Sequence, residues 1–163
     1  MVYRIWVFVG VQHATSNYTS ANVIPSNPLP LVPRMAIRVV RLGTPRLPQE
    51  GPRIGTVRRP PRGVKKADFA KLDYFDVWLP ELAPTQETVS WALAEPWTDK
   101  RWATFAKKYR SEMSAPAARH LIDLLATMSR HTDLSVGCYC DDESRCHRAV
   151  LRELLIESGA TTA

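Results

Sequence analysis

The chain has 163 residues, of which 45% are hydrophobic and 23% charged, and its formal net charge at pH 7 is +6. This length suits one domain with its own core, and no apolar run approaches the roughly 18 residues of a membrane span, so we expect no membrane partner. Three cysteines cannot form a closed set of disulfides, and we therefore expect a reducing, cytoplasmic location.

The first 34 residues differ in character from the rest. An apolar stretch, IWVFVGV, follows Arg4 and leads into a tract rich in Ser, Thr, Asn and Pro without helical or strand periodicity. The opening resembles a short signal peptide, but its basic region is thin and no Ala-x-Ala cleavage site follows. A second methionine, Met35, stands directly before the first regular pattern. We predict that 1–34 is a disordered or non-native extension and that the domain spans 35–160.

Positive charge is concentrated in the next part of the chain. Between Arg34 and Lys71 there are eleven Lys and Arg residues against two acidic residues, so this segment carries +9 and the remainder −3. A localised basic segment attracts anions such as a phosphate metabolite, a nucleic acid or an acidic protein partner. A solvated basic face without a ligand is the alternative interpretation.

Strand patterns precede helical patterns. The alternating, β-branched stretch 35–42 predicts a first strand, 54–59 predicts a second, and 74–80 has strand composition. Apolar residues at spacings of three and four then predict three helices, over 85–95, 98–113 and 114–131. Thr85 and Ser114 are the expected N-caps of the first and third helix.

The chain closes with a predicted strand over 134–140 and a helix over 146–158, which Gly159 stops. This order predicts an α/β fold, a single domain with a mostly parallel sheet flanked by helices in a Rossmann-like three-layer arrangement. In such sheets ligands collect where strands end and helices begin. Because RRPPRG (58–63) and DDESRCHR (141–148) both follow predicted strands, we predict that they form one site.

Several phrases of the sequence resemble the domain of unknown function 488 family, to which the YeaO-like proteins belong. These phrases are RLGTPR, EGPRIGTVRRPPRGV, YFDVWLPELAPT, WATFAKKYRSEM and the closing CYCDDESRCHRAVLRELL. The resemblance covers about Met35 to Gly159. It implies a small α/β protein of bacterial type and does not imply a reaction.

The family's motifs can be placed on this chain residue by residue. Many members resemble Cys-x-Glu after the last strand, where this chain has Cys138-Tyr139-Cys140. A thiol therefore takes the place of the carboxylate unless Asp141 or Asp142 replaces it, and an acid–base role of that glutamate does not carry over. The other elements fall on Arg59, Pro61, Arg62 and Gly63, on Trp78, Leu79, Leu82, Ala83 and Pro84, and on Cys146, His147 and Arg148.

A metal site is one interpretation of the C-terminal motif. Cys138, Cys140, Cys146 and His147 supply zinc ligands, but their spacing is unlike the Cys-x₂₋₄-Cys turns of structural zinc sites. Cys138 and Cys140 would share one face of a strand, whereas side chains of the adjacent Cys146 and His147 would point about 100° apart on a helix. We therefore predict no cofactor, with zinc as the weaker alternative.

A reactive thiol is a second interpretation. Cys146 is the candidate because a helix N-terminus with Arg145 and Arg148 nearby favours a thiolate, and His147 is the candidate catalytic partner. Four residues separate Cys140 from Arg145, so the motif lacks the Cys-x₅-Arg spacing of a phosphatase loop. The neighbouring acidic residues would also oppose a bound phosphate.

An anion site is the third interpretation. The amides at a helix N-terminus and the Arg148 guanidinium suffice to hold a phosphate or carboxylate. Arg58, Arg59 and Arg62 would complete the site from the other loop, with looser charge from Lys65. In the alternative without a ligand, His147 and Arg148 pack against the helix and pair with the three neighbouring acidic residues.

The sequence favours an anionic, phosphate-bearing small molecule as ligand of 58–66 and 138–148, and leaves open whether Cys146 or His147 performs chemistry on it. Asp76 and Trp78 are candidate supporting residues, together with Cys138 and Cys140. Two other classes of function stay open. One is a non-catalytic binding module for nucleic acid or a protein through the basic segment 34–71, and the other is a thiol redox or zinc-binding protein.

Overall fold

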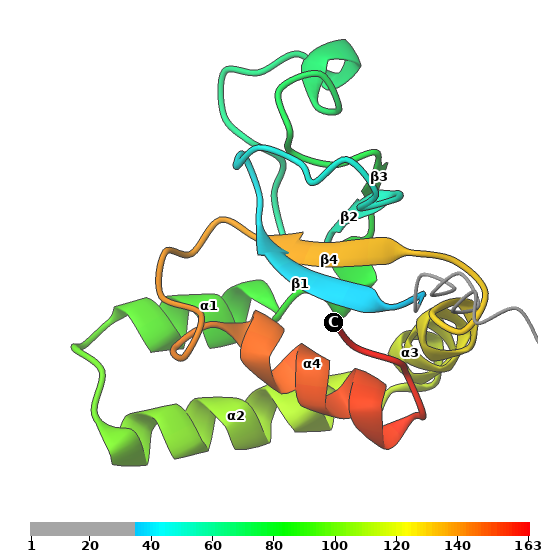
Figure 1. Cartoon of the computed structure of the whole chain (residues 1–163). Helices are drawn as coiled ribbons and strands as arrows, with labels where there is room; N and C mark the ends of the chain where they lie inside the picture. The colour runs from blue at the N-terminus through cyan, green and yellow to red at the C-terminus, as the bar shows by residue number, and fades with distance from the viewer. Residues whose placement is uncertain (1–34) are drawn as a thin grey trace, which may run out of the picture. The chain divides into compact units, whose positions relative to one another are not determined.

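A sheet of four parallel strands forms the centre of the computed structural model, which describes residues 35–163. The strands are β1 (Ile37–Arg41), β2 (Arg53–Gly55), β3 (Val77–Trp78) and β4 (Leu134–Cys138), in the spatial order β1-β4-β2-β3 (Figure 1). The last strand of the sequence is thus inserted between the first two. All five of its residues are buried, as expected for a strand covered on both faces of a parallel sheet.

Four α-helices cover one face of the sheet (Figure 1). They are α1 (Gln86–Leu93), α2 (Asp99–Met113), α3 (Pro116–Met128) and α4 (His147–Glu157). Strand residues that alternate toward this face form one core cluster with the apolar stripes of the helices, because burying both surfaces together removes them from water. The cluster includes Ile37, Ile54, Leu134, Val136, Phe105, Tyr109, Ile122, Leu151 and Leu155.

Loops and a short 3₁₀ helix, η1 (Lys66–Asp68), cover the opposite face. The side chains of Phe75 and Leu42 lie where a Cβ would stand on Gly55 and on Gly137, so they pack directly on the strand backbone. The parallel α/β fold is therefore confirmed, and its layer opposite the helices is built from loops rather than from helices.

A buried ion pair lies within this loop layer. Arg53 Nε donates to Glu50 Oε1 over 2.6 Å and Arg53 Nη2 donates to Glu50 Oε2 over 2.7 Å. Ser135 of β4 donates its hydroxyl to Glu50 over 2.6 Å. The pair thereby joins the segment before β2 to the central strand.

Most of the predicted elements are confirmed, with shorter strands. β2 ends at Gly55 and β3 has two residues. Thr85 caps α1 as predicted, since its side chain accepts a hydrogen bond from the Thr88 amide, and Gly159 follows α4 with a φ of 84°. The prediction that Ser114 caps α3 is wrong, because Ser114 ends α2 and α3 begins after Ala115 with Pro116.

The C-terminal residues extend the sheet beyond the last helix. Ile37 donates its amide to the Thr161 carbonyl, and the Ala163 amide donates to the Ile37 carbonyl. Within residues 35–163, no helix combines the length and apolar character that crossing a membrane requires. The predicted extension 1–34 lies outside the described residues.

Candidate functional site

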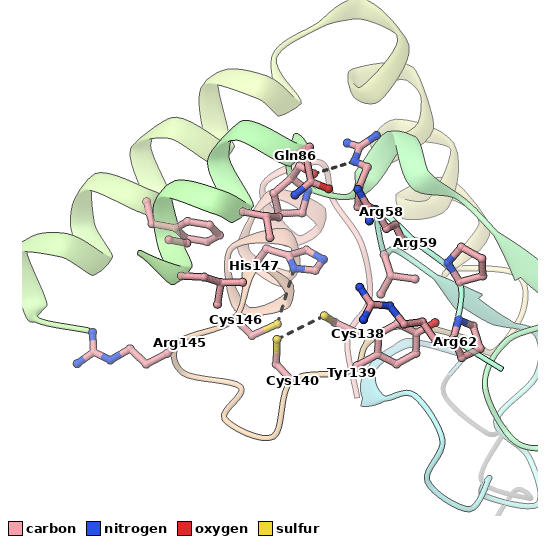
Figure 2. A pocket seen from close by; sticks show the side chains of 18 of the residues that line it. Arg58, Arg59, Arg62, Gln86, Cys138, Tyr139, Cys140, Arg145, Cys146 and His147 are labelled. Carbon is pink, nitrogen blue, oxygen red and sulfur yellow. Dashed lines mark hydrogen bonds between the residues drawn. The ribbon is translucent and has the colours of Figure 1, made fainter. Parts of the chain in front are cut away.

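A cavity of about 680 Å³ opens at the carboxyl ends of β2 and β4. Its walls come from the segment 57–62 after β2, from α1 and α2 with their connection, and from the β4–α4 segment (Figure 2). Ligand sites of open parallel sheets form at this edge, and the volume is within the usual range of small-molecule sites, about 300–1,000 Å³. The structure therefore brings RRPPRG together with Cys146 and His147 of the Cys-His-Arg motif around one cavity.

Arg59 and Arg62 form the cationic part of the rim. Both side chains line the cavity and both residues are exposed. Neither takes part in an ion pair with another residue of 35–163. Pro60 and Pro61 stand between them and restrict the backbone that carries the two guanidinium groups.

Arg58 lines the same cavity but is held by the protein itself. Its Nε donates to the Pro84 carbonyl over 2.9 Å and its Nη2 donates to the Ala83 carbonyl over 2.7 Å. These bonds fix the start of the basic loop to the turn before α1. Arg58 therefore helps to shape the cavity wall, and its guanidinium already has two hydrogen-bond partners within the protein.

His147 is buried at the inner end of the cavity. Its Nε2 lies 2.7 Å from the Thr56 carbonyl oxygen, which can only accept, so the ring proton is on Nε2 and Nδ1 carries a lone pair. The ring lies edge-on to Tyr109, with centroids 5.4 Å apart. Burial lowers the pKa of His147 to about 4, and the imidazole is therefore neutral at pH 7.

The three thiols converge beside this imidazole (Figure 2). The Sγ atoms of Cys138 and Cys140 are 3.6 Å apart, and Cys146 Sγ is 3.8 Å from His147 Nδ1. Cys138 and Cys146 are buried, whereas Cys140 is exposed. The sequence placed these residues near one another in the chain, and the fold brings their reactive atoms into contact.

The activation of Cys146 stays a prediction, and its surroundings in the folded protein oppose it. Its interactions with Cys138 and Cys140, together with burial, raise the pKa of the Cys146 thiol. The interactions that Cys140 makes with Cys138 and Cys146, aided by the positive charge of Arg148, lower the pKa of the Cys140 thiol instead. The contacts among the three thiols are the largest cause of both shifts, and burial adds to the rise at Cys146.

Arg148 does not line the cavity, contrary to its predicted place in an anion clamp. Its residue is 3% exposed, and its Nη2 donates to the Asp141 carbonyl over 3.3 Å. Its buried Nε has no hydrogen-bond partner, and it forms no ion pair with any residue of 35–163. The Arg148 guanidinium is therefore buried beside the β4–α4 segment and does not face the cavity.

The remaining predicted residues lie outside the cavity lining. Lys65 is exposed on the basic loop. Asp76 accepts hydrogen bonds of 2.7 Å from Arg46 and from the Arg53 amide, so it orients an arginine on the other side of β2. Trp78 donates its Nε1 hydrogen to the Val57 carbonyl over 2.7 Å and supports the wall only indirectly.

Part of the cavity wall was missed by sequence reasoning. Leu93 and Trp97 give it an apolar side, and Gln86 and Tyr139 add polar atoms. Arg145, considered above only as a neighbour of Cys146, lines it as well and pairs with Asp99 over 2.7 Å. The apolar residues match the periodicity of helix packing, so no local signal marks them as parts of a site.

Cys138, Cys146 and His147 also form a cluster that could hold a metal ion. One ligand atom from each residue lies within 4.8 Å of the others, and all three residues are buried. Cys140 adds a third sulfur next to Cys138.

The fold and site define a small parallel α/β protein with a Cys/His cluster at the carboxyl edge of its sheet. The family model described as the Active DUF488-N3 subclade matches residues 37–159. The chain therefore belongs to this family, which confirms the resemblance seen in the sequence.

Mycobacterial proteins are similar to this chain over most of its length. The chain is 28% identical over 125 residues to the uncharacterized protein Rv3073c of Mycobacterium tuberculosis strain H37Rv, covering 77% of this chain and 98% of the relative. The same values hold for the uncharacterized protein Mb3100c of Mycobacterium bovis. No solved structure matches the chain.

Proposed function

We propose that the protein binds an anionic, phosphate-bearing small molecule in the cavity at the carboxyl edge of the sheet. The observation that carries this proposal is the pair of exposed arginines without ion-pair partners among residues 35–163, Arg59 and Arg62, on the rim of a 680 Å³ cavity. Guanidinium groups bind phosphate and carboxylate through paired N–H donors.

The distribution of charge favours this cavity over an extended nucleic-acid surface. Five cationic side chains of the basic segment pair with acidic residues of the protein, namely Arg38, Arg41, Arg46, Arg53 and Lys71. The four basic side chains of residues 35–71 left without an ion pair or a carbonyl partner in the described part of the chain are Arg59, Arg62, Lys65 and Lys66. They gather on the short segment 59–66, which ends at the start of η1, instead of forming an extended stripe.

The apolar wall indicates that the ligand carries more than its anionic group. Leu93 is 77% exposed and lines the cavity beside Trp97. Covering such a surface with an apolar or aromatic group is favourable, because it removes apolar area from water. A nucleoside monophosphate combines a ring and a phosphate at a size suited to this volume, so it is the first probe.

The test compares ligand-induced stabilisation of the full chain with that of two double variants. Arg59→Gln/Arg62→Gln removes two charges that line the cavity, and Lys65→Gln/Lys66→Gln removes two charges from the same loop outside it. A ligand present at 100 times its Kd stabilises by about 2.7 kcal/mol, or about 5–10 °C in Tm for a chain of this size. We expect nucleoside monophosphates to stabilise the wild type and the lysine variant, and the arginine variant to lose this effect.

Two results would contradict the proposal. Equal loss in both double variants would indicate that loop charge alone attracts the ligand. Binding of short single-stranded RNA or DNA with a steep loss of affinity at rising salt, and no response to mononucleotides, would favour the nucleic-acid alternative.

A further inference from the structure

The inner wall of the cavity carries four metal-ligating atoms on one side: the sulfurs of Cys138, Cys140 and Cys146, and Nδ1 of His147 (Figure 2). We propose that these four residues bind a zinc ion. This proposal rests on the geometry of the cluster and is independent of the anion site at Arg59 and Arg62.

Two of the separations between ligand atoms match the edges of a zinc tetrahedron. With Zn–S bonds of about 2.3 Å and Zn–N bonds of about 2.0–2.1 Å, tetrahedral geometry places two sulfurs about 3.8 Å apart and sulfur and nitrogen about 3.6 Å apart. The Cys138–Cys140 sulfurs are 3.6 Å apart, and Cys146 Sγ is 3.8 Å from His147 Nδ1. Cys138, Cys146 and His147 each place one ligand atom within 4.8 Å of the others, and a turn of the Cys140 side chain toward them would supply the fourth ligand.

The backbone removes the geometric objection that the sequence raises. Cys146 does not have helical dihedral angles, since its φ of −119° and ψ of 144° are those of extended chain, and the helix starts at His147. Adjacent side chains across this junction can converge, whereas adjacent positions within a helix diverge. Likewise β4 ends at Cys138, which frees Cys140 to turn toward Cys138.

His147 is held in the orientation and tautomer of a ligand. Its Nε2 hydrogen is donated to the Thr56 carbonyl over 2.7 Å, which leaves the Nδ1 lone pair toward Cys146. A metal-bound histidine almost always donates its other ring N–H to a carbonyl or carboxylate. The contact with Tyr109 fixes the ring further, so this half of the site is preorganised.

Arg148 supplies the charge that such a site requires. Three thiolates and one Zn²⁺ ion carry a net charge of −1, and Arg148 is 3% exposed with an unpartnered Nε. Its guanidinium contacts the carbonyl of Asp141, the residue next to Cys140. Buried charges are normally paired or next to a metal centre, and the zinc–thiolate group would be the counter-charge of this arginine.

The donor set selects the metal by class. Thiolate ligands favour zinc over magnesium and calcium, which prefer oxygen, and three sulfurs with one imidazole suit tetrahedral zinc. All four residues line the cavity, and Cys140 is the exposed one, so the metal would be reached from solvent on the side of Cys140.

The test begins with the full chain and Co²⁺ as a spectroscopic probe. We expect one zinc per chain after purification in zinc-containing medium, and Co²⁺ in its place to give the intense visible bands of tetrahedral cobalt with a thiolate charge-transfer band. Substitution of a ligand should lower the affinity for zinc by more than the roughly 100-fold that the loss of an outer-shell partner costs. The variants are Cys140→Ser, Cys146→Ser and His147→Gln. His120→Gln, an exposed histidine on α3, is the matched control.

Two measurements keep the proposal testable if a variant fails to fold. X-ray absorption at the zinc edge of the wild-type chain should show three sulfurs at about 2.3 Å and one nitrogen at about 2.0–2.1 Å. Zinc should also protect the exposed thiol of Cys140 from alkylation and prevent a Cys138–Cys140 disulfide. A shell of oxygen and nitrogen only, or thiol reactivity unchanged by zinc, would overturn the proposal.

Arg148 provides a separate test of the charge argument. Arg148→Met should lower the affinity for zinc by about 10- to 100-fold, while the Co²⁺ spectrum remains that of a tetrahedral site. Arg148→Lys should recover part of the lost affinity. Zinc affinity that is equal in Arg148→Met and the wild type would overturn the proposed role of this arginine as counter-charge.

Discussion

His147 Nε2 lies 2.7 Å from the carbonyl oxygen of Thr56, a residue 91 positions earlier in the chain. Thr56 directly follows β2, and His147 is the first residue of α4. The contact therefore ties the start of the basic loop to the start of the last helix. It holds together the two parts of the chain that build the cavity, and it determines which imidazole nitrogen faces the thiols.

Removing the charge of Glu50 should strongly destabilise the fold. Glu50 and Arg53 are 2% and 1% exposed and form a bidentate pair, and Glu50→Gln would leave a buried guanidinium without a counter-charge. Loss of one partner of a buried pair costs about 3–5 kcal/mol. Urea denaturation should show this loss, whereas Glu157→Gln at the surface should change the free energy of unfolding by less than about 1 kcal/mol.

The same carboxylate should make stability depend on acid pH. Burial opposes ionisation of Glu50, but hydrogen bonds from Arg53 and Ser135 prevail and lower its pKa from 4.5 to about 2. The folded state thus binds fewer protons, so the stabilisation is complete above about pH 4.5 and is lost as pH falls toward about 2. Urea titrations between these values should give a steeper pH dependence for the wild type than for Glu50→Gln, and parallel curves would contradict the assignment.

Two glycines with similar backbone should respond differently to alanine. Gly51 and Gly63 have φ values of 72° and 74°, so either substitution costs about 1–2 kcal/mol for a left-handed backbone. A Cβ on Gly51 would also overlap the Asp133 carbonyl, whereas a Cβ on Gly63 would meet nothing within 4 Å. We expect Gly51→Ala to lower the free energy of unfolding by a further 1–3 kcal/mol or so, and equal losses in thermal or urea unfolding would refute this.

Leu93→Ala should separate ligand binding from stability. Leu93 lines the cavity and is 77% exposed, so its truncation should change the free energy of unfolding by less than about 0.5 kcal/mol. Loss of this apolar contact should weaken the binding of a nucleoside monophosphate by about 1–2 kcal/mol, which raises the Kd roughly 5- to 30-fold. Calorimetric titration is the measurement, and Leu124→Ala, 53% exposed on α3, should leave affinity unchanged.

The sequence by itself determined the types and order of the elements. Hydrophobic periodicity marked the helices, Thr85 and Gly159 marked helix ends, and β-branched alternation marked β1 and β4. The carboxyl ends of parallel strands meet at one edge, so two motifs that follow strands could be expected to meet there. These features are legible because they depend on local chemistry and on general rules of sheet topology.

Only the tertiary structure decided what the individual side chains do. Sequence reasoning favoured Cys146 as the acidic thiol and Arg148 as an anion ligand, and the fold buries both. It also let Cys146 and His147 converge through an extended residue at the helix start. Burial, the direction of a side chain and its pKa depend on contacts between segments far apart in the chain, and no local pattern encodes them.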